Sequence, residues 1–77
     1  KHLNLSISGR VQGVFFRDTA RREAQRLGIN GFARNEPNGA VWIEAEGDEA
    51  KLDEFLQWCH KGPTWGRVDK VVVTEGD

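Results

Sequence analysis

The segment GRVQGVFFR, from Gly9 to Arg17, places an arginine where a helix is expected to begin. A helix N-terminus carries partial positive charge, so a cation there is unfavourable unless a nearby anion offsets it. Gly9 and Gly13 allow backbone conformations that other residues avoid, and consecutive N–H groups in such a loop can form an anion-binding nest. Because helical side chains lean toward the N-terminus, Arg17 would reach back over this loop, where its guanidinium can hold two phosphate or carboxylate oxygens. The segment therefore indicates an anion site.

A purely structural explanation of the same segment stays open. A Gly-x-x-x-Gly loop is a common connection into a helix, and Asp18 would partly offset the charge of Arg17. The helix carries further arginines that we expect on its solvated face: Arg21, Arg22 and Arg26. Spacing alone leaves the anion site the less favoured of the two interpretations. The Walker pattern Gly-x-x-x-x-Gly-Lys-Ser/Thr is not met, so a nucleotide triphosphatase is not expected.

Asn35 is a second polar residue in an unusual place, near the end of an expected strand. Asparagine is disfavoured in strands, but the adjacent turn at Pro37 to Gly39 explains it without any function. A side-chain amide can also donate to one group while accepting from another, which allows it to orient a water molecule. Taken alone, Asn35 favours the turn explanation.

Composition limits the remaining possibilities. The 77 residues carry a formal net charge of −1, which gives no general attraction for nucleic acid or an anionic membrane. Cys59 is the only cysteine, so no intrachain disulfide can form, and we expect a reducing, cytoplasmic setting. His2 on a strand and His60 beside Cys59 lack convergent partners, so no metal site and no cofactor are expected. No apolar run approaches the ~20 residues that cross a bilayer.

Hydrophobic periodicity and turn residues predict the elements that position these side chains. We expect one domain over residues 1–77 with the order strand, helix, strand, strand, helix, strand. The expected segments are a strand around Leu3, Leu5 and Ile7, a loop from Gly9 to Phe15, a helix from Phe16 to Leu27, strands from Phe32 to Glu36 and Ala40 to Glu46, a helix from Asp48 to Lys61, and a strand from Val68 to Thr74.

Turn and cap residues separate these segments. Gly28 should end the first helix, Asn30-Gly31 allows a turn, and Asp48 is the expected N-cap of the second helix. The consecutive valines Val71 to Val73 leave the buried face of the last strand open. The element order predicts an α+β, ferredoxin-like split βαββαβ sandwich with two helices on one face of an antiparallel sheet. This fold hosts many functions and does not select one.

The two polar segments together resemble the signatures of the acylphosphatase family. GRVQGVFFR is similar to the first signature, a phosphate-binding loop that ends in an essential arginine. GINGFARNEPNGAVWIEAEG, from Gly28 to Gly47, is similar to the second, which contains the catalytic asparagine. WCHKGP and RVDKV fit the family's later helix end and strand start, so the resemblance covers nearly the whole chain in order.

The resemblance implies a residue-by-residue assignment. Arg17 would bind the phosphate, Asn35 would position the attacking water, and the substrate would be cradled by the backbone amides of Gln12, Gly13, Val14, Phe15 and Phe16. The implied activity is metal-independent hydrolysis of the carboxyl–phosphate bond of acylphosphates to a carboxylate and inorganic phosphate. A mixed anhydride already has a good leaving group, so positioning and charge stabilisation can supply most of the catalysis. The implied partners are a small acylphosphate and inorganic phosphate, with no nucleic acid or membrane, and the chain is expected to be a monomer.

The sequence also departs from the family pattern. Phe32 and Ala33 stand where the family usually has tryptophan and valine, and Asn38 replaces a common aspartate in the turn. The family usually continues into another short strand at the sheet edge, whereas this sequence stops at Asp77. Two alternatives stay open: that strand is disordered or was cut away, or the second strand is left as a bare edge beside Asn35.

Two other functions stay open. The chain could be a non-catalytic anion-binding module of a larger maturation or transferase enzyme, which would bind phosphate at Arg17 without turnover. It could also be an RNA-binding module in which Trp42 stacks on a base, although the near-neutral charge and the missing aromatic sheet signature disfavour this.

Overall fold

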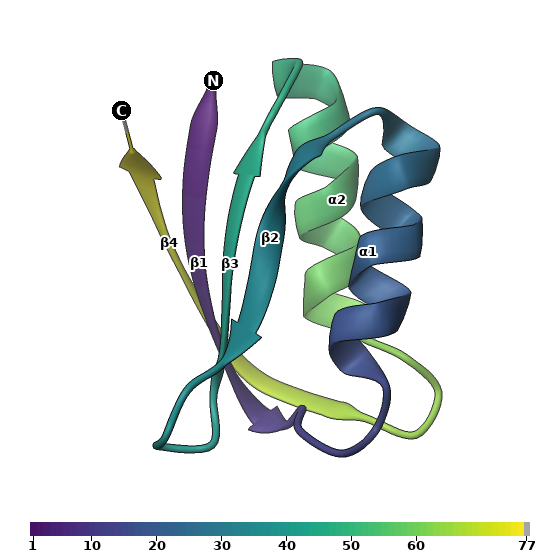
Figure 1. Ribbon diagram of the computed structural model, residues 1–77, viewed down its shortest axis with the longest axis vertical. Coiled ribbons are helices and arrows are strands. Elements are labelled where there is room, and N and C mark those ends of the chain that lie inside the picture. The colour runs from purple at the N-terminus through teal and green to yellow at the C-terminus, as the bar shows by residue number, and fades with distance from the viewer. Residues whose placement is uncertain (77) are drawn as a thin grey trace.

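The computed structural model describes residues 1–76 as a four-stranded sheet with two helices packed on one face (Figure 1). The elements are β1 (His2–Arg10), α1 (Phe16–Leu27), β2 (Asn30–Asn35), β3 (Val41–Glu46), α2 (Glu49–Lys61) and β4 (Arg67–Gly76). The strand order is β2-β3-β1-β4, and every neighbouring pair is antiparallel. The predicted split βαββαβ sandwich is confirmed.

The core lies between the helices and one face of the sheet. Leu5 of β1 pairs directly with Ile43 of β3, and both side chains are buried. The same alternation buries Leu3 and Ile7, so the period-2 pattern of β1 is confirmed. The helices contribute a second set of buried side chains: Phe16, Ala20, Leu27, Leu52, Phe55 and Cys59. Full burial of one large aliphatic or aromatic side chain contributes about 1.5–3 kcal/mol, so this shared core is what holds the two layers together.

The predicted loop before α1 begins too early. Gly9 and Arg10 belong to β1, and the connecting loop comprises residues 11–15. Gly9 lies at a bulge in the pairing of β1 with β4, where its φ is +131°. A Cβ built there would come within 2.2 Å of the carbonyl oxygen of Arg67. Gly9 is therefore required by the close approach of β4, whereas Gly13 alone serves the loop.

Replacing Gly9 with alanine is expected to destabilise the fold by at least about 2 kcal/mol, because the new methyl group would clash with backbone and force an unfavourable φ. For a domain of this size, that loss lowers the Tm by about 10 °C, measurable by thermal denaturation. Gly47→Ala is the matched control, since its Cβ would make only an ordinary contact at 3.5 Å with Ile29. Equal Tm values for the two variants would contradict the assignment.

The predicted turn at Asn30-Gly31 is wrong, because both residues lie inside β2. Gly28 alone reverses the chain, with a φ of +72° and a backbone N–H that donates to the carbonyls of Ala24 and Gln25. Gly31 instead permits close strand pairing, since a Cβ there would lie 1.8 Å from the carbonyl oxygen of Glu44. The preference of Asn-Gly for turns was overridden by the pairing of β2 with β3.

Two further boundaries differ in detail. Asp48 occupies the N-cap position of α2, but its carboxylate makes no capping hydrogen bond, and only its carbonyl accepts from Leu52, at 2.9 Å. The last strand is longer than predicted at both ends, because its pairing with β1 runs from Arg67 to Gly76. That register also shows which face of the sheet each valine occupies. Val72 pairs with Ser6 and faces away from the helices, whereas Val71 and Val73 face the helices.

The hairpin between β2 and β3 forms as predicted. Gly39 has a φ of +93°, and the side-chain oxygen of Asn38 accepts a hydrogen bond from the N–H of Ala40 at 3.0 Å. Asn38 therefore performs the local hydrogen bonding that an aspartate would provide at this position.

β2 is an edge strand of the sheet, because among residues 1–76 its only strand partner is β3. Asn35 is the last residue of this outer strand. The expectation about a further edge strand concerns sequence outside the described residues and stays a prediction.

Candidate active site

The loop between β1 and α1 is held by alternating buried side chains. Val11, Val14 and Phe16 are at most 8% exposed and anchor the loop in the core. Between them, Gly13 and Phe15 have φ values of +74° and +61° and point outward. Residues in the left-handed backbone conformation within a turn direct successive N–H groups to the same side of the chain, and a backbone nest forms in this way. The sequence did not reveal that Phe15 adopts this conformation, which is unusual for a bulky side chain.

The backbone N–H groups of this loop lack protein acceptors. Within residues 1–76, no N–H group from Gln12 to Asp18 makes a hydrogen bond to a backbone or side-chain acceptor. The first N–H that does is that of Thr19, which donates to the carbonyl of Phe15 at 3.0 Å. Unpaired N–H groups together with the positive end of the α1 dipole make this segment suited to binding an anion.

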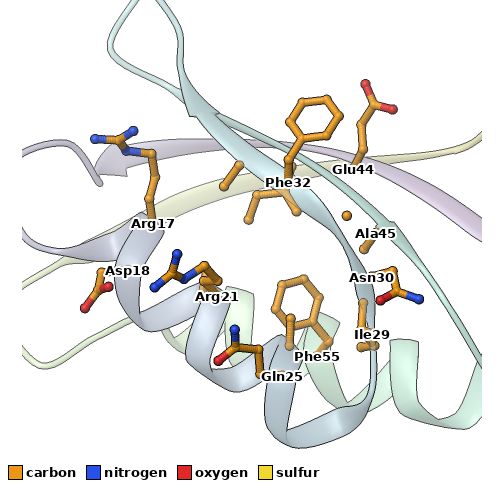
Figure 2. A pocket seen from close by; sticks show the side chains of 15 residues that line it. Arg17, Asp18, Arg21, Gln25, Ile29, Asn30, Phe32, Glu44, Ala45 and Phe55 are labelled. Atoms are coloured by element: carbon orange, nitrogen blue, oxygen red, sulfur yellow. The ribbon is translucent and has the colours of Figure 1, made fainter.

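Arg17 follows directly in the first turn of α1, where its side chain is exposed and forms no ion pair within the described part of the chain. Asp18 lies beside it in the first turn of α1, as expected, but does not form an ion pair with Arg17. The Asp18 carboxylate pairs instead with Arg22, one turn along the helix, at 3.2 Å. Figure 2 shows the side chains of Arg17 and Asp18 pointing away from each other. The guanidinium of Arg17 is thus free for a ligand.

The expected placement of the other helix arginines is confirmed, since Arg21, Arg22 and Arg26 are all exposed. Arg26 also pairs with Glu23 within the helix. Arg22 and Arg26 therefore form ion pairs with carboxylates of the same helix, whereas Arg17 does not.

Asn35 lies at the same end of the sheet as the loop and the start of α1 (Figure 1). It pairs with Val41, whose side chain is fully buried under the helices, so Asn35 is on the helix-covered face of β2. Its side chain is exposed and makes no hydrogen bond to the rest of residues 1–76. A free amide on this face, beside the loop, is available to a water or a ligand.

The side chain of Gln12 joins the loop to the β2–β3 hairpin. Its amide nitrogen donates to the carbonyls of Glu36 and Ala40, both at 2.8 Å. The two segments are 24 and 28 residues apart in the sequence. These bonds hold the loop next to the strand end that carries Asn35. The sequence assigned Gln12 only a backbone role, and no sequence signal marks the contact of its side chain.

A groove of about 590 Å³ runs from Arg17 along α1 beside β2. Arg21 and Gln25 continue the row along the helix, and Phe55 and Ile29 lie deeper in the groove (Figure 2). Phe32 is 50% exposed and pairs with Glu44 on the strand next to it. The groove therefore extends from Arg17 toward β2, the strand at the edge of the sheet.

The titratable groups elsewhere do not assemble into a metal site. No group of three His, Cys, Asp or Glu side chains that could hold a metal ion occurs in the part of the chain that the structure describes. His2 Nε2 lies 3.3 Å from Glu44 Oε1 and 3.1 Å from Asn4 Oδ1, and the side chain of His60 is exposed. The absence of a metal requirement stays a prediction for the assay below.

Cys59 is fully buried in the core. Burial, with a smaller contribution from the charge of Glu23, raises the pKa of the Cys59 thiol from 9.0 to about 12. The thiol therefore stays protonated at neutral pH and cannot act as a nucleophile in the folded protein.

The raised pKa of Cys59 predicts a loss of stability in alkali. The unfolded chain releases the thiol proton near pH 9, whereas the folded chain retains it until about pH 12. Stability from this group is complete below pH 9 and falls between pH 9 and 12, by up to about 1.4 kcal/mol per pH unit. Urea denaturation at pH 8 and 10 measures the change, and Cys59→Ala should flatten it. An identical slope in the variant would contradict the prediction.

The Trp42 ring is partly covered by neighbouring side chains. The side chain is half-buried, its indole N–H donates to Glu44 at 3.0 Å, and the guanidinium of Arg34 lies 5.7 Å from the ring centroid. The RNA-binding alternative gains no support from this arrangement. None of the helices described is long and apolar enough to span a membrane.

Comparison with known proteins identifies the family. The acylphosphatase family model matches residues 3–77. The chain is 49% identical over 75 residues to an acylphosphatase of Rubrobacter xylanophilus, covering 97% of this chain and 68% of the relative. The crystal structure of acylphosphatase from Bacillus subtilis superposes with a TM-score of 0.95 at 35% identity, covering 97% of this chain and 83% of that one.

A larger protein contains a similar unit. The crystal structure of full-length HypF, in its phosphate- and nucleotide-bound form, matches with a TM-score of 0.91 at 28% identity. The match covers 99% of this chain but only 10% of that protein. The family match over nearly the full chain, the unpaired loop amides and the free Arg17 all agree. The chain belongs to the acylphosphatase family, the enzymes that hydrolyse the carboxyl–phosphate bond of acylphosphates.

Proposed function

We propose that the loop amides of Gln12 to Phe16 cradle the phosphoryl group of an acylphosphate, that Arg17 holds its oxygens, and that Asn35 positions the attacking water. The observation that carries this proposal is the row of N–H groups without acceptors, followed directly by an arginine without an ion pair. The loop N–H groups and the guanidinium of Arg17 are hydrogen-bond donors without protein acceptors, and they lie at a helix N-terminus, where negative charge is favoured.

The proposed reaction is a direct displacement at phosphorus. The water oxygen forms a bond to phosphorus while the bond from phosphorus to the acyl oxygen breaks, and the carboxylate leaves with that electron pair. The fixed amides and the guanidinium of Arg17 stabilise the negative charge on the phosphoryl oxygens. The amide of Asn35 can orient the water by accepting from it. Glu36, the carboxylate next to Asn35, is paired with Arg34 at 3.3 Å, so we assign the water's proton to a phosphoryl oxygen of the substrate.

The same proposal covers the partners of the chain. The substrate is a small acylphosphate, and inorganic phosphate is both a product and an inhibitor that competes for the cradle. We also propose that the protein is a cytoplasmic monomer and that it binds no nucleic acid, membrane or metal.

A steady-state assay with benzoyl phosphate tests it. We expect hydrolysis that persists in excess EDTA and competitive inhibition by inorganic phosphate. A version of the protein extended at its C-terminus should be assayed in parallel, because Asn35 lies on the outer strand of the sheet. Loss of activity in EDTA, restored by a divalent metal, would contradict the mechanism.

A non-catalytic anion-binding module is the second candidate. It is favoured by the match to a tenth of the much larger HypF, which shows a unit of this shape inside another protein. Phosphate binding without turnover of benzoyl phosphate, in both the short and the extended protein, would support this candidate over hydrolysis.

A further inference from the structure

The side chain of Gln12 binds the two carbonyls that close the β2–β3 hairpin. The turn is framed by two backbone hydrogen bonds, from the N–H of Glu36 to the carbonyl of Ala40 at 2.8 Å and from the N–H of Gly39 to the carbonyl of Glu36 at 3.1 Å. Each of these carbonyls also accepts a hydrogen bond from the amide nitrogen of Gln12, at 2.8 Å. A carbonyl oxygen can accept two hydrogen bonds, so Gln12 completes the pairing of both acceptors. We call these two side-chain hydrogen bonds the Gln12 bridge.

The chemistry of the bridge requires an amide at this position. Both acceptors are carbonyl oxygens, so the side-chain nitrogen must face them, and each of its two hydrogens binds one carbonyl. The Gln12 side chain is half-buried, which limits the access of competing water to these bonds. A side chain without donors therefore cannot replace the bridge.

The bridge lies directly beside Asn35. Asn35 precedes Glu36 in the chain and pairs with Val41, which follows Ala40. The two carbonyls of the bridge thus flank the strand pair that carries the Asn35 side chain. β2 is at the edge of the sheet and has only β3 as a strand partner among residues 1–76 (Figure 1). Gln12 therefore supplies a second attachment for the end of this edge strand.

Gln12 is also the first residue of the proposed cradle. Its backbone N–H is one of the loop donors that have no protein acceptor in residues 1–76. The buried side chains of Val11 and Val14 anchor the loop in the core on either side of it. The core thus fixes the backbone of residue 12, and the side chain of the same residue fixes the hairpin.

We infer that Gln12 is a positioning residue for the hydrolysis, and that the Gln12 bridge holds the amide of Asn35 at the distance from the cradle that the attacking water requires. The inference rests on the proposed function, because it needs a phosphoryl group in the loop and a water at Asn35. Displacing reacting groups by about 1 Å can cost about 100-fold in rate, so a loosened hairpin lowers the rate without any lost contact to the substrate.

The test is Gln12→Met, which keeps the length of the side chain but has no hydrogen-bond donor. The kcat for benzoyl phosphate should fall about tenfold, because Asn35 is no longer held in place. The KM and the inhibition constant of inorganic phosphate should stay within about twofold, because Val11 and Val14 still anchor the loop N–H groups. Gln57→Met is the matched control, since Gln57 is exposed on α2, and it should retain full kcat.

A double variant separates positioning from a purely structural role. If Gln12 acts through Asn35, adding Gln12→Met to Asn35→Ala should cause no further loss of kcat. Two independent effects would multiply, so that the double variant would lose about 1,000-fold and not the roughly 100-fold of Asn35→Ala alone. All assays are run at a temperature at which circular dichroism shows each variant to be folded, because loss of the bridge also lowers the Tm.

A spectroscopic measurement gives a readout that does not depend on turnover. The NMR order parameter of the Asn35 backbone N–H should be near the rigid value of about 0.85 in the unmodified protein and below about 0.7 in Gln12→Met. The order parameter of Val14 should be the same in both proteins, because its side chain is buried in the core.

Four outcomes would overturn the inference. These are a kcat for Gln12→Met equal to that of the unmodified protein, losses that multiply in the double variant, an unchanged order parameter at Asn35, and weaker inhibition by phosphate in Gln12→Met. The last result would mean that Gln12 supports the cradle and not Asn35. If the unmodified protein does not hydrolyse benzoyl phosphate, the proposed function itself fails, and this result is distinct because the other four are differences between variants.

Discussion

Replacing Arg17 with alanine is expected to lower kcat/KM for benzoyl phosphate roughly 10³-fold, because a guanidinium that holds two phosphoryl oxygens contributes more than one neutral donor. Inhibition by inorganic phosphate should weaken in parallel, since the same oxygens are held in product and transition state. The free energy of unfolding should not fall. Arg17 is exposed, has no ion pair and sits at the positive end of α1, so its removal should stabilise the helix by about 0.3–1 kcal/mol.

Arg21→Ala is the matched control for this variant, because Arg21 is also exposed and follows Arg17 by one helical turn. It should retain activity, which would show that the loss in Arg17→Ala comes from one position and not from the charge of the helix. Arg17→Lys keeps the charge without the planar fork and should recover only part of the rate. A kcat/KM for Arg17→Ala within threefold of the unmodified protein would exclude the proposed phosphate-binding role.

Replacing Asn35 with alanine is expected to lower kcat about 100-fold and to leave KM and phosphate inhibition nearly unchanged. A residue that orients the attacking water acts on the rate of the chemical step, whereas the loop and Arg17 hold the phosphoryl group. Because the side chain is exposed and makes no hydrogen bond within residues 1–76, stability should change by less than about 0.5 kcal/mol. Steady-state kinetics and urea denaturation measure both quantities.

Asn30→Ala provides the control for Asn35, since it removes the same amide from the first residue of the same strand. Asn30 pairs with Glu46, away from the loop, and should keep full activity. Asn35→Asp removes the donor and adds a negative charge beside a bound phosphoryl group, so it should lower activity and raise KM. Full turnover in Asn35→Ala would show that the water is positioned by another group.

The sequence predicted the layers of the fold because its apolar residues follow the periods of the elements. The alternation of Leu3, Leu5 and Ile7 and the helical spacing of Phe16, Ala20 and Leu27 are burial patterns, and the structure confirms them. Errors occurred where a long-range backbone contact overrides local preference. Gly9 and Gly31 read as loop and turn residues, but both are required by a carbonyl of a paired strand.

The candidate site was predictable only in part. The resemblance named Arg17 and Asn35, and the structure adds that both side chains are exposed and free of hydrogen-bond partners among residues 1–76. Their roles in catalysis stay predictions. The contact of the Gln12 side chain could not be derived from the sequence, because it depends on how the loop packs against a hairpin 24 to 28 residues away.

The two hydrogen bonds of Gln12 have a consequence for hydrogen exchange in the native state. Because its amide bridges the loop to the carbonyls of Glu36 and Ala40, opening of the hairpin requires release of the loop. Saturating phosphate should therefore slow amide exchange at Gly39, whose N–H donates to Glu36, by the factor 1 + [L]/Kd that protects the loop. Gln12→Ala should remove this protection from Gly39. An unchanged exchange rate at Gly39 with phosphate bound would mean that the loop and the hairpin open independently. If the rate falls as expected, exchange at Gly39 measures the affinity of the site for phosphate, although the ligand does not contact this turn.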